Sequence, residues 1–167
     1  MEKKHTCCFT GHREIDSSVI KPLKKSLKRV LQQLIKEGYL QFISGGALGF
    51  DLLAAETVLN LKQKHPHIHL TMALPCRNQD AFWNLEQKAK YNAVLSLADD
   101  IIYTAEGYYN GCMFKRNRYM VDNASCVIAY LTHGSGGTKY TVDYAEKMSR
   151  NIIFVNHRPG CQLSFFA

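Results

Sequence analysis

The sequence predicts an α/β domain built as a three-layer sandwich, in which helices flank a mostly parallel central sheet. Short apolar runs alternate along the chain with longer segments of helical periodicity, which is the order typical of β–α–β units. Several of these runs are continuously apolar, as expected of parallel strands that are buried on both faces. The loops that follow such strands gather at one edge of the sheet, and ligands bind there where the strand order reverses.

The first half of the chain is predicted to contain three strands and two helices. Pro22 suits the first position of the first helix and Gly38 suits its end, while Asp51 is placed to cap the second helix, which stops at His65-Pro66. The first helix carries an apolar stripe made by Leu23, Leu27, Val30, Leu31 and Leu34. The expected strands are 6–9, 41–44 and 67–74, and the expected helices are 22–37 and 52–65.

The second half continues the alternation with three more helices and three more strands. The next helix is expected to carry Phe82, Leu85, Ala89 and Ala93 on its apolar face. A short strand, 100–103, follows, and then a loop, 107–111. The remaining elements are expected to be a helix at 114–124, a strand at 126–131, a helix that ends at Met148 and a strand at 152–155.

Length and composition indicate one globular domain. The chain has 167 residues, of which 46% are hydrophobic and 21% are charged. We expect a domain at 1–156 and a C-terminal appendage at 157–167. No apolar run approaches the length of a membrane span, and no signal peptide precedes the first strand, so a cytoplasmic protein with reduced cysteines is expected. No metal site is predicted, no cofactor is specified, and homo-oligomers are possible.

The net charge of +7 permits either nucleic acid or an anionic small molecule as a partner. We interpret the basic cluster of the first helix as a solvated outer face, because a nucleic-acid groove more often interleaves aromatic side chains with the charge. The cluster consists of Lys21, Lys24, Lys25, Lys28 and Arg29.

Two glycine-rich turns each join a predicted strand to a predicted helix. Glycine allows the backbone to approach a ligand closely, and the start of a helix directs free N–H groups and a positive dipole end toward it. One such turn meets the ordinary need for glycine between strand and helix, whereas a pair predicts a phosphate-bearing ligand. The candidate ligand-binding residues of the turns are Ser44, Gly45 and Gly46 in the first, and Gly134, Ser135, Gly136, Gly137 and Thr138 in the second.

A third candidate segment, Gly11-His12-Arg13, follows the first strand. Arg13 can pair with phosphate through two hydrogen bonds, and His12 can donate to a phosphate or act as an acid or base. A plain surface loop is the alternative. Asp51 either caps its helix or accepts hydrogen bonds from a ribose hydroxyl.

Arg116 and Asn117 lie on the helix that follows the loop 107–111. Being adjacent, they are expected to point about 100° apart, with Arg116 toward the ligand. A basic face exposed to solvent is the alternative interpretation. Neither glycine turn has the spacing of the Gly-x-Gly-x-x-Gly dinucleotide fingerprint or of a P-loop, which argues against ordinary dehydrogenases and P-loop ATPases.

These motifs resemble those of a known superfamily. The segment 44–51, Ser-Gly-Gly-Ala-Leu-Gly-Phe-Asp, resembles the Ser-Gly-x-Ala-x-Gly-Ile-Asp element of the DNA-processing protein DprA. The segment 116–120, followed by a strand and by Gly136-Gly137-Thr138, is similar to the cytokinin-activating LOG phosphoribohydrolases. The order of elements over roughly residues 5–156 resembles the SLOG superfamily of Rossmann-like nucleotide-ligand domains, and most closely its YpsA-like branch.

The resemblance implies a Rossmann-like domain that binds or senses a nucleotide-derived ligand such as NAD, ADP-ribose or a mononucleotide. Two alternatives follow from it: a nucleotide N-glycosidic hydrolase of the LOG type, and DprA-like binding of single-stranded DNA. The LOG enzymes have a glutamate three residues after the Gly-Thr pair, where this chain has Thr141, and an aspartate where it has Ser125. The absence of the glutamate at position 141 argues against hydrolysis of the N-glycosidic bond.

Overall fold

The computed structural model describes residues 2–155, so the expected appendage at 157–167 lies outside the described residues. The strands are β1 (Thr6–Gly11), β2 (Gln41–Ser44), β3 (His69–Leu74), β4 (Asp100–Tyr103), β5 (Cys126–Tyr130) and β6 (Asn151–Phe154). The helices are α1 (Ser17–Lys36), α2 (Phe50–Lys62), α3 (Leu85–Leu97), α4 (Cys112–Asp122) and α5 (Gly136–Lys147), with a short 3₁₀ turn, η1 (Lys3–His5), before β1.

The predicted α/β fold is confirmed, and every strand pair in the sheet is parallel. The strand order is β4-β3-β2-β1-β5-β6. The chain therefore builds outward from β1 to β4, returns to pair β5 with the other side of β1, and ends with β6 on the outside. The strand order reverses between β1 and β5, which makes their carboxyl ends the expected position for a ligand.

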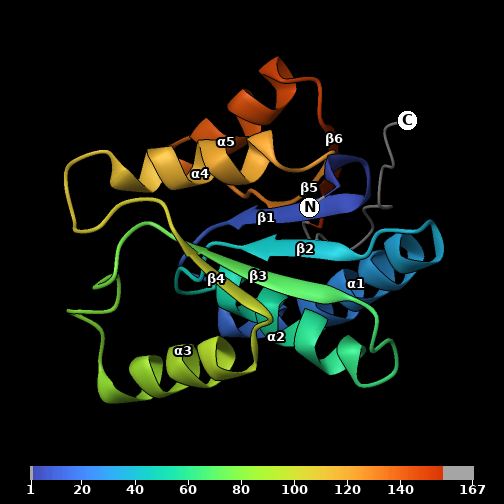
Figure 1. The fold of residues 1–167 in the computed structure, drawn as a ribbon, viewed down its shortest axis with the longest axis horizontal. Helices are drawn as coiled ribbons and strands as arrows, with labels where there is room; N and C mark the ends of the chain where they lie inside the picture. The colour runs from blue at the N-terminus through green and yellow to red at the C-terminus, as the bar shows by residue number, and fades with distance from the viewer. Residues whose placement is uncertain (1, 156–167) are drawn as a thin grey trace.

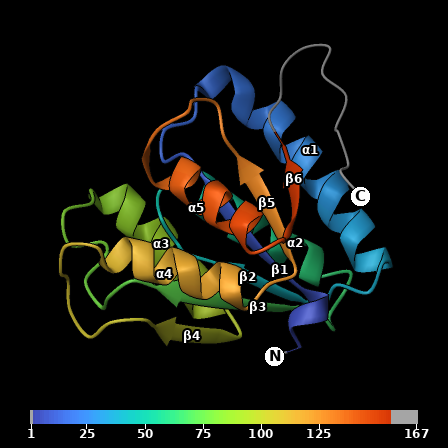
Figure 2. The same ribbon diagram turned by 90° about the horizontal axis from the view of Figure 1, so that it is seen from above.

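Helices cover both faces of the sheet and enclose two hydrophobic cores (Figure 1). α1, α2 and α3 lie on one face, where the larger core gathers around fully buried side chains such as Phe9, Phe42 and Phe50. α4 and α5 lie side by side on the other face, as the second view shows (Figure 2), over a smaller core that includes Met120 and Val142. No helix within residues 2–155 is both long and apolar enough to cross a membrane.

Helix α1 begins five residues before the predicted position, at Ser17. The prediction that Pro22 occupies the first helical position is wrong, because Asp16 provides a stronger start: its side chain accepts a hydrogen bond of 2.8 Å from the N–H of Ser18. Pro22 instead lies inside the helix. The predicted apolar stripe is confirmed, since all five of its members are buried, and Gly38 follows the helix with a positive φ of 94°.

The prediction that Asp51 caps α2 is also wrong. The helix begins at Phe50, and Gly49 is its N-cap residue with a φ of 79°. A Cβ atom on Gly49 would lie 2.2 Å from the carbonyl oxygen of Arg13, so this position tolerates only glycine. Asp51 lies in the first turn of the helix and is buried, so its carboxylate does not serve as the N-cap group of α2.

The prediction of which residues form the buried apolar face of α3 is wrong. Phe82 lies before the helix, and the side chains of Leu85, Ala89 and Ala93 are exposed instead of buried. The face that joins the larger core, beside α2, is marked by Tyr91 and Val94, each only 3% exposed. The predicted strands 41–44 and 100–103 are confirmed at both ends, and, apart from the start of α1, the other predicted elements differ from the structure by one to three residues at one or both ends.

We expect Gly11→Ala to destabilise the fold, because an added Cβ would lie 2.4 Å from the side chain of fully buried Phe50. Forcing an extra methyl group into packed surroundings typically costs about 1–3 kcal/mol. Urea unfolding measures the loss. Gly107→Ala is the matched control, because no atom of the described residues, chain neighbours apart, lies within 4 Å of a Cβ built there. Equal unfolding midpoints for the two variants would contradict this packing.

Candidate functional site

A cavity of about 300 Å³ opens at the point where the strand order reverses. It lies between the loops that follow β1 and β5 and the first turns of α4 and α5. Segments that are far apart in the sequence thus meet at one edge of the sheet. Ten predicted site residues line this cavity: Gly11, His12, Arg13, Asp51, Arg116, Asn117, Ser135, Gly136, Gly137 and Thr138.

Several other side chains that line the cavity were not among the predicted site residues. Met113 and Phe114 belong to the first turn of α4, which begins at Cys112, two residues before the predicted start of that helix at Phe114. Their position at the cavity therefore depends on a boundary that sequence patterns place poorly. His133 adjoins the second glycine turn, and its proximity to Gly134 was the available signal. The remaining lining residues are Phe9, Thr10 and Ala47.

Four predicted site residues do not line the cavity: Ser44, Gly45, Gly46 and Gly134. Ser44 is fully buried, and its hydroxyl donates a 2.8 Å hydrogen bond to the carbonyl of Asp51 while it accepts one of 3.3 Å from the N–H of Gly46. These bonds hold the turn in place. Gly46 has a φ of 66°, and a Cβ there would lie 3.0 Å from Met72. Ser44 and Gly46 therefore stabilise the turn and its packing within the protein.

Gly45 is needed because the buried side chain of Arg116 lies directly against it. A Cβ on Gly45 would lie 2.4 Å from Nη1 of Arg116 and 2.8 Å from Oδ2 of Asp51. Nη1 donates a hydrogen bond to the carbonyl oxygen of Gly45, and Nε donates one of 2.8 Å to Oδ1 of Asn117. Adjacent on the helix, Arg116 and Asn117 nevertheless meet through their side chains. The first glycine turn thus accommodates a protein side chain.

The second glycine turn, in contrast, faces open space. Apart from chain neighbours and the backbone of the same helix, no atom of residues 2–155 lies within 4 Å of a Cβ built on Gly134, Gly136 or Gly137, and Gly136 has a φ of 87°. The side chain of Ser135, the N-cap residue of α5, makes no capping hydrogen bond. Gly111, the N-cap residue of α4, has no side chain with which to cap. Two helix starts without side-chain caps therefore meet at this cavity, an arrangement that favours an anion.

Asp51 and Arg116 bring a buried carboxyl group and a buried guanidinium to the cavity. Burial raises the pKa of Asp51 from 3.8 to about 6, against the opposing effects of Arg116, the backbone of Ala47 and Arg13. Burial likewise lowers the pKa of Arg116, while the charge of Asp51 opposes that change. Among residues 2–155, Asp51 is the only carboxylate that lines the cavity, and two arginines accompany it. The local charge at neutral pH is therefore positive.

His12 is fixed in one tautomer by the loop that follows β5. Its Nε2 accepts a 2.9 Å hydrogen bond from the N–H of Thr132, which requires a neutral ring with the proton on Nδ1. Burial and, to a smaller extent, His133 lower the pKa of His12. The rings of His12 and His133 stack with centroids 3.9 Å apart. His12 can thus donate from Nδ1 near neutral pH without carrying a charge.

Phe114 places an aromatic surface at the cavity. Its side chain is 42% exposed, and its ring makes an edge contact with Tyr140, the centroids lying 4.5 Å apart. The hydroxyl of Tyr140 accepts a 2.7 Å hydrogen bond from Arg118, which holds that ring in place. An exposed aromatic ring with fixed neighbours is suited to stack on a planar group.

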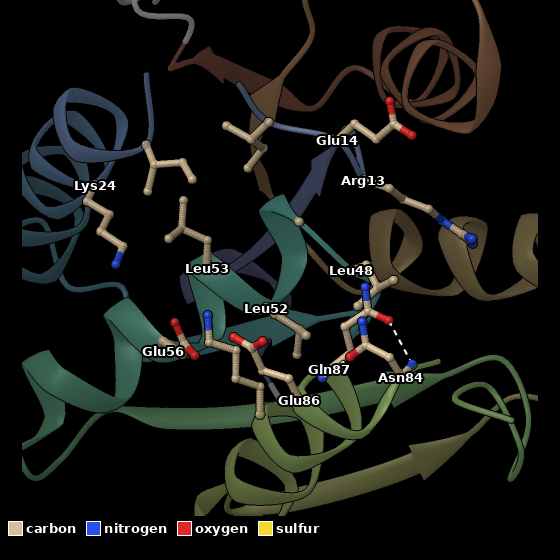
Figure 3. A pocket seen from close by; sticks show the side chains of 14 residues that line it. Arg13, Glu14, Lys24, Leu48, Leu52, Leu53, Glu56, Asn84, Glu86 and Gln87 are labelled. Carbon is tan, nitrogen blue, oxygen red and sulfur yellow. Dashed lines mark hydrogen bonds between the residues drawn. The ribbon is translucent and has the colours of Figure 1, made fainter. Parts of the chain in front are cut away.

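A second cavity, of about 560 Å³, lies on the other face, between α1, α2 and the start of α3 (Figure 3). Leu52 and Leu53 form part of its floor. Arg13 lines both cavities, and in Figure 3 its side chain points away from Lys24 on α1. The charged residues of this second cavity are three basic and three acidic: Arg13, Lys24 and Lys90, and Glu14, Glu56 and Glu86. Without a basic excess, it is less suited to phosphate than the first cavity. Within residues 2–155, no group of His, Cys, Asp and Glu side chains is arranged to hold a metal ion.

The raised pKa of Asp51 predicts a specific dependence of stability on pH. The folded protein binds more protons than the unfolded chain between pH 3.8 and about 6, so its stability falls as pH rises through this window. Relative to Asp51→Asn, which cannot titrate, we expect the wild type to lose about 2–3 kcal/mol of unfolding free energy between pH 4 and pH 7. Urea unfolding across this range measures both profiles, and parallel profiles would contradict the assignment.

Comparison with solved structures shows the same fold in proteins of distant sequence. DNA processing protein A from Helicobacter pylori superposes with a TM-score of 0.66 at 17% identity, covering 95% of this chain and 68% of that one. The corresponding protein from Streptococcus pneumoniae gives a TM-score of 0.67 at 18% identity, covering 91% of this chain and 50% of its own. At these identities the likeness establishes the fold alone.

Comparison of sequences identifies the family. The SPbeta prophage-derived protein YoqJ of Bacillus subtilis is 39% identical over 138 residues, covering 75% of this chain and 81% of its own. A UPF0398 protein of Halalkalibacterium halodurans is 33% identical over 128 residues, covering 75% of this chain and 68% of its own. The model of the YpsA family, described as the YspA SLOG family, matches residues 7–156. The chain therefore belongs to the YpsA family of SLOG proteins.

Proposed function

We propose that this domain binds a nucleotide-derived ligand in the cavity at the carboxyl ends of β1 and β5, with mononucleotides, ADP-ribose and NAD as the candidate class. The observation that carries the proposal is the meeting of an open glycine turn, at the start of α5, with two arginines at one cavity. A volume of about 300 Å³ is at the lower end of small-molecule sites, which favours a ligand of mononucleotide size.

The phosphate is assigned to the start of α5. The backbone N–H groups of Gly136 and Gly137 and the hydroxyl of Thr138 are the donors there, and the helix dipole adds a favourable field. Arg13, which is exposed and lines the cavity, supplies a positive charge that is accessible to the phosphate. Arg116 is only 3% exposed and is already bonded within the protein, so it contributes positive potential.

The sugar and the base are assigned to the other sides of the cavity. Asp51 does not cap α2, and its buried carboxylate can accept hydrogen bonds from ribose hydroxyls. Phe114 offers its exposed ring to the base, since base–aromatic stacking suits any nucleobase. Phosphate, sugar and base thus each have a group of matching chemistry.

An N-glycosidic hydrolase is the weaker candidate. Thr141 stands where the LOG enzymes have a glutamate, and its hydroxyl donates a 2.8 Å hydrogen bond to the carbonyl of Gly137 while the side chain is 1% exposed. No acid is therefore presented from that position. Chromatography after incubation with AMP tests this alternative, because release of free adenine would identify a hydrolase.

Binding of single-stranded DNA is the third candidate. The basic cluster of α1 is exposed to solvent, as interpreted from the sequence, and α1 covers the face of the sheet opposite to α4 and α5. The excess positive charge is thus separated from the cavity by the sheet. A salt-dependent affinity for oligonucleotides that exceeds the affinity for mononucleotides would favour this candidate.

We expect a mononucleotide such as AMP to stabilise the protein and Arg13→Ala to weaken its binding. Hydrogen bonds to charged groups contribute about 1.5–3 kcal/mol, which corresponds to a loss of roughly 10–100-fold in affinity. Calorimetric titration measures the affinity, and a thermal-shift series with AMP, ADP-ribose, NAD and ribose 5-phosphate ranks the ligands. Arg77→Ala is the matched control, because Arg77 is an exposed arginine that stacks on Tyr103 away from this cavity. The proposal fails if none of these compounds stabilises the protein, or if the two arginine variants bind equally.

We further expect Phe114→Ala to weaken the binding of AMP by roughly 5–100-fold, since stacking of a base on an aromatic ring contributes about 1–3 kcal/mol. Binding of ribose 5-phosphate, which has no base, should stay unchanged, and Phe114→Trp should retain AMP. Phe82→Ala serves as the control, because that ring is fully exposed outside the cavity. An equal loss for AMP and ribose 5-phosphate would show that Phe114 does not contact the base.

A further inference from the structure

Helix α3 carries apolar residues on two opposite faces. Its inner face lies beside α2 and contributes Tyr91 and Val94 to the larger core. Its outer face presents Leu85, which is 88% exposed, and Leu97, which is 65% exposed. A surface helix normally has one apolar face, which it buries against the core, yet α3 lies at the outer margin of the molecule (Figure 1) with exposed apolar side chains as well. This uncovered outer face therefore indicates a docking surface.

The outer apolar residues form a single ridge whose pattern reads the same in both directions. Leu85, Ala89, Ala93 and Leu97 follow one another at four-residue intervals and are all exposed, which aligns them along one i±4 row of the helix surface. The two leucines flank the two alanines symmetrically about position 91. Exposed Phe82 precedes the ridge and exposed Ile101, on edge strand β4, follows it. Such symmetry is what a surface needs in order to pack against a copy of itself across a two-fold axis.

We propose that this ridge is the surface through which two copies of the chain associate, with their α3 helices running in opposite directions. Leu85 of each copy then faces Leu97 of the other, and Ala89 faces Ala93. The small alanines at the centre allow the two helices to approach closely, and packing of i±4 ridges against each other is the commonest mode between helices.

The charge distribution makes α3 a better surface for a second copy than α1. Within α3 the charged residues are Glu86, Lys88 and Lys90, so each copy brings a net charge of only +1 to the contact and the repulsion between two copies is small. The chain as a whole carries a net charge of +7, and contact through α1 would oppose five basic residues to five others. Association through α3 avoids this repulsion.

The apolar area sets the expected strength of association. An aromatic side chain such as Phe82 contributes about 150–250 Å² when buried, and together with Leu85, Leu97 and Ile101 it supplies roughly half of the 800 Å² per partner that a standard interface buries. Polar flanks supply the remainder. We therefore expect a reversible dimer that dissociates on dilution.

Sedimentation velocity of the full chain over a range of about 1 to 500 µM tests the proposal, since a reversible dimer of micromolar affinity changes its average mass within that range. The wild type should shift from monomer to dimer, whereas Leu85→Lys should stay monomeric. Leu85 is 88% exposed, so this variant is expected to fold, and circular dichroism checks that it does. Tyr108→Lys, at a 68% exposed residue outside α3, is the matched control and should dimerise like the wild type.

A second variant tests the opposed direction of the helices. In Leu85→Lys combined with Leu97→Glu, each new lysine faces the glutamate of the other copy, so dimerisation should return. The two positions are about 18 Å apart along one helix, so they cannot pair within a chain. Failure of this double variant to dimerise overturns the proposed arrangement. A wild type that stays monomeric at the highest concentration, or a dimer that survives Leu85→Lys, overturns the proposal that the ridge is a dimer interface.

Discussion

The buried guanidinium of Arg116 connects the parts of the molecule that form the candidate site. From α4 on one face of the sheet, it donates hydrogen bonds to the carbonyl of Gly45 after β2, to the carbonyl of Ala73 in β3 and to Gln79 in the following loop. A buried charge is costly unless it is paired and hydrogen-bonded, and here Asp51 provides the opposite charge. The positions of the first glycine turn, of α4 and of the cavity floor all follow from satisfying this one group.

The two glycine turns look alike in the sequence, but they differ in what occupies the space beside them. At the first turn, that space is filled by the protein itself, by Arg116 against Gly45 and by Met72 close to Gly46. At the second turn, the space beside Gly134, Gly136 and Gly137 is open. A glycine therefore indicates that something lies close to the backbone or that the backbone has an unusual conformation, and only the fold shows whether the neighbour is the protein or a ligand.

Much of the architecture could be predicted from periodicity, because the strands and helices of a parallel sheet have distinct patterns and a fixed order. Ten site residues also converge as expected, since loops after parallel strands share an edge. The errors have physical causes. Asp16 starts α1 ahead of Pro22, and Gly49 starts α2 ahead of Asp51, because capping depends on backbone conformation. The buried face of α3 was predicted wrongly because apolar residues lie on both of its faces, and periodicity alone does not say which face is buried.

The pairing of β1 with β5 determines when the candidate cavity forms during folding. Cys7 and Cys126 are neighbours across these strands, although most of the chain lies between them in the sequence. Bringing such distant segments together is the slow part of folding, because the entropy of closing a long loop must be overcome before the contact forms. Since the cavity is built at this junction, it forms only once the first strand, β1, has paired with the fifth, β5, and an incompletely folded chain that lacks this pairing does not contain it.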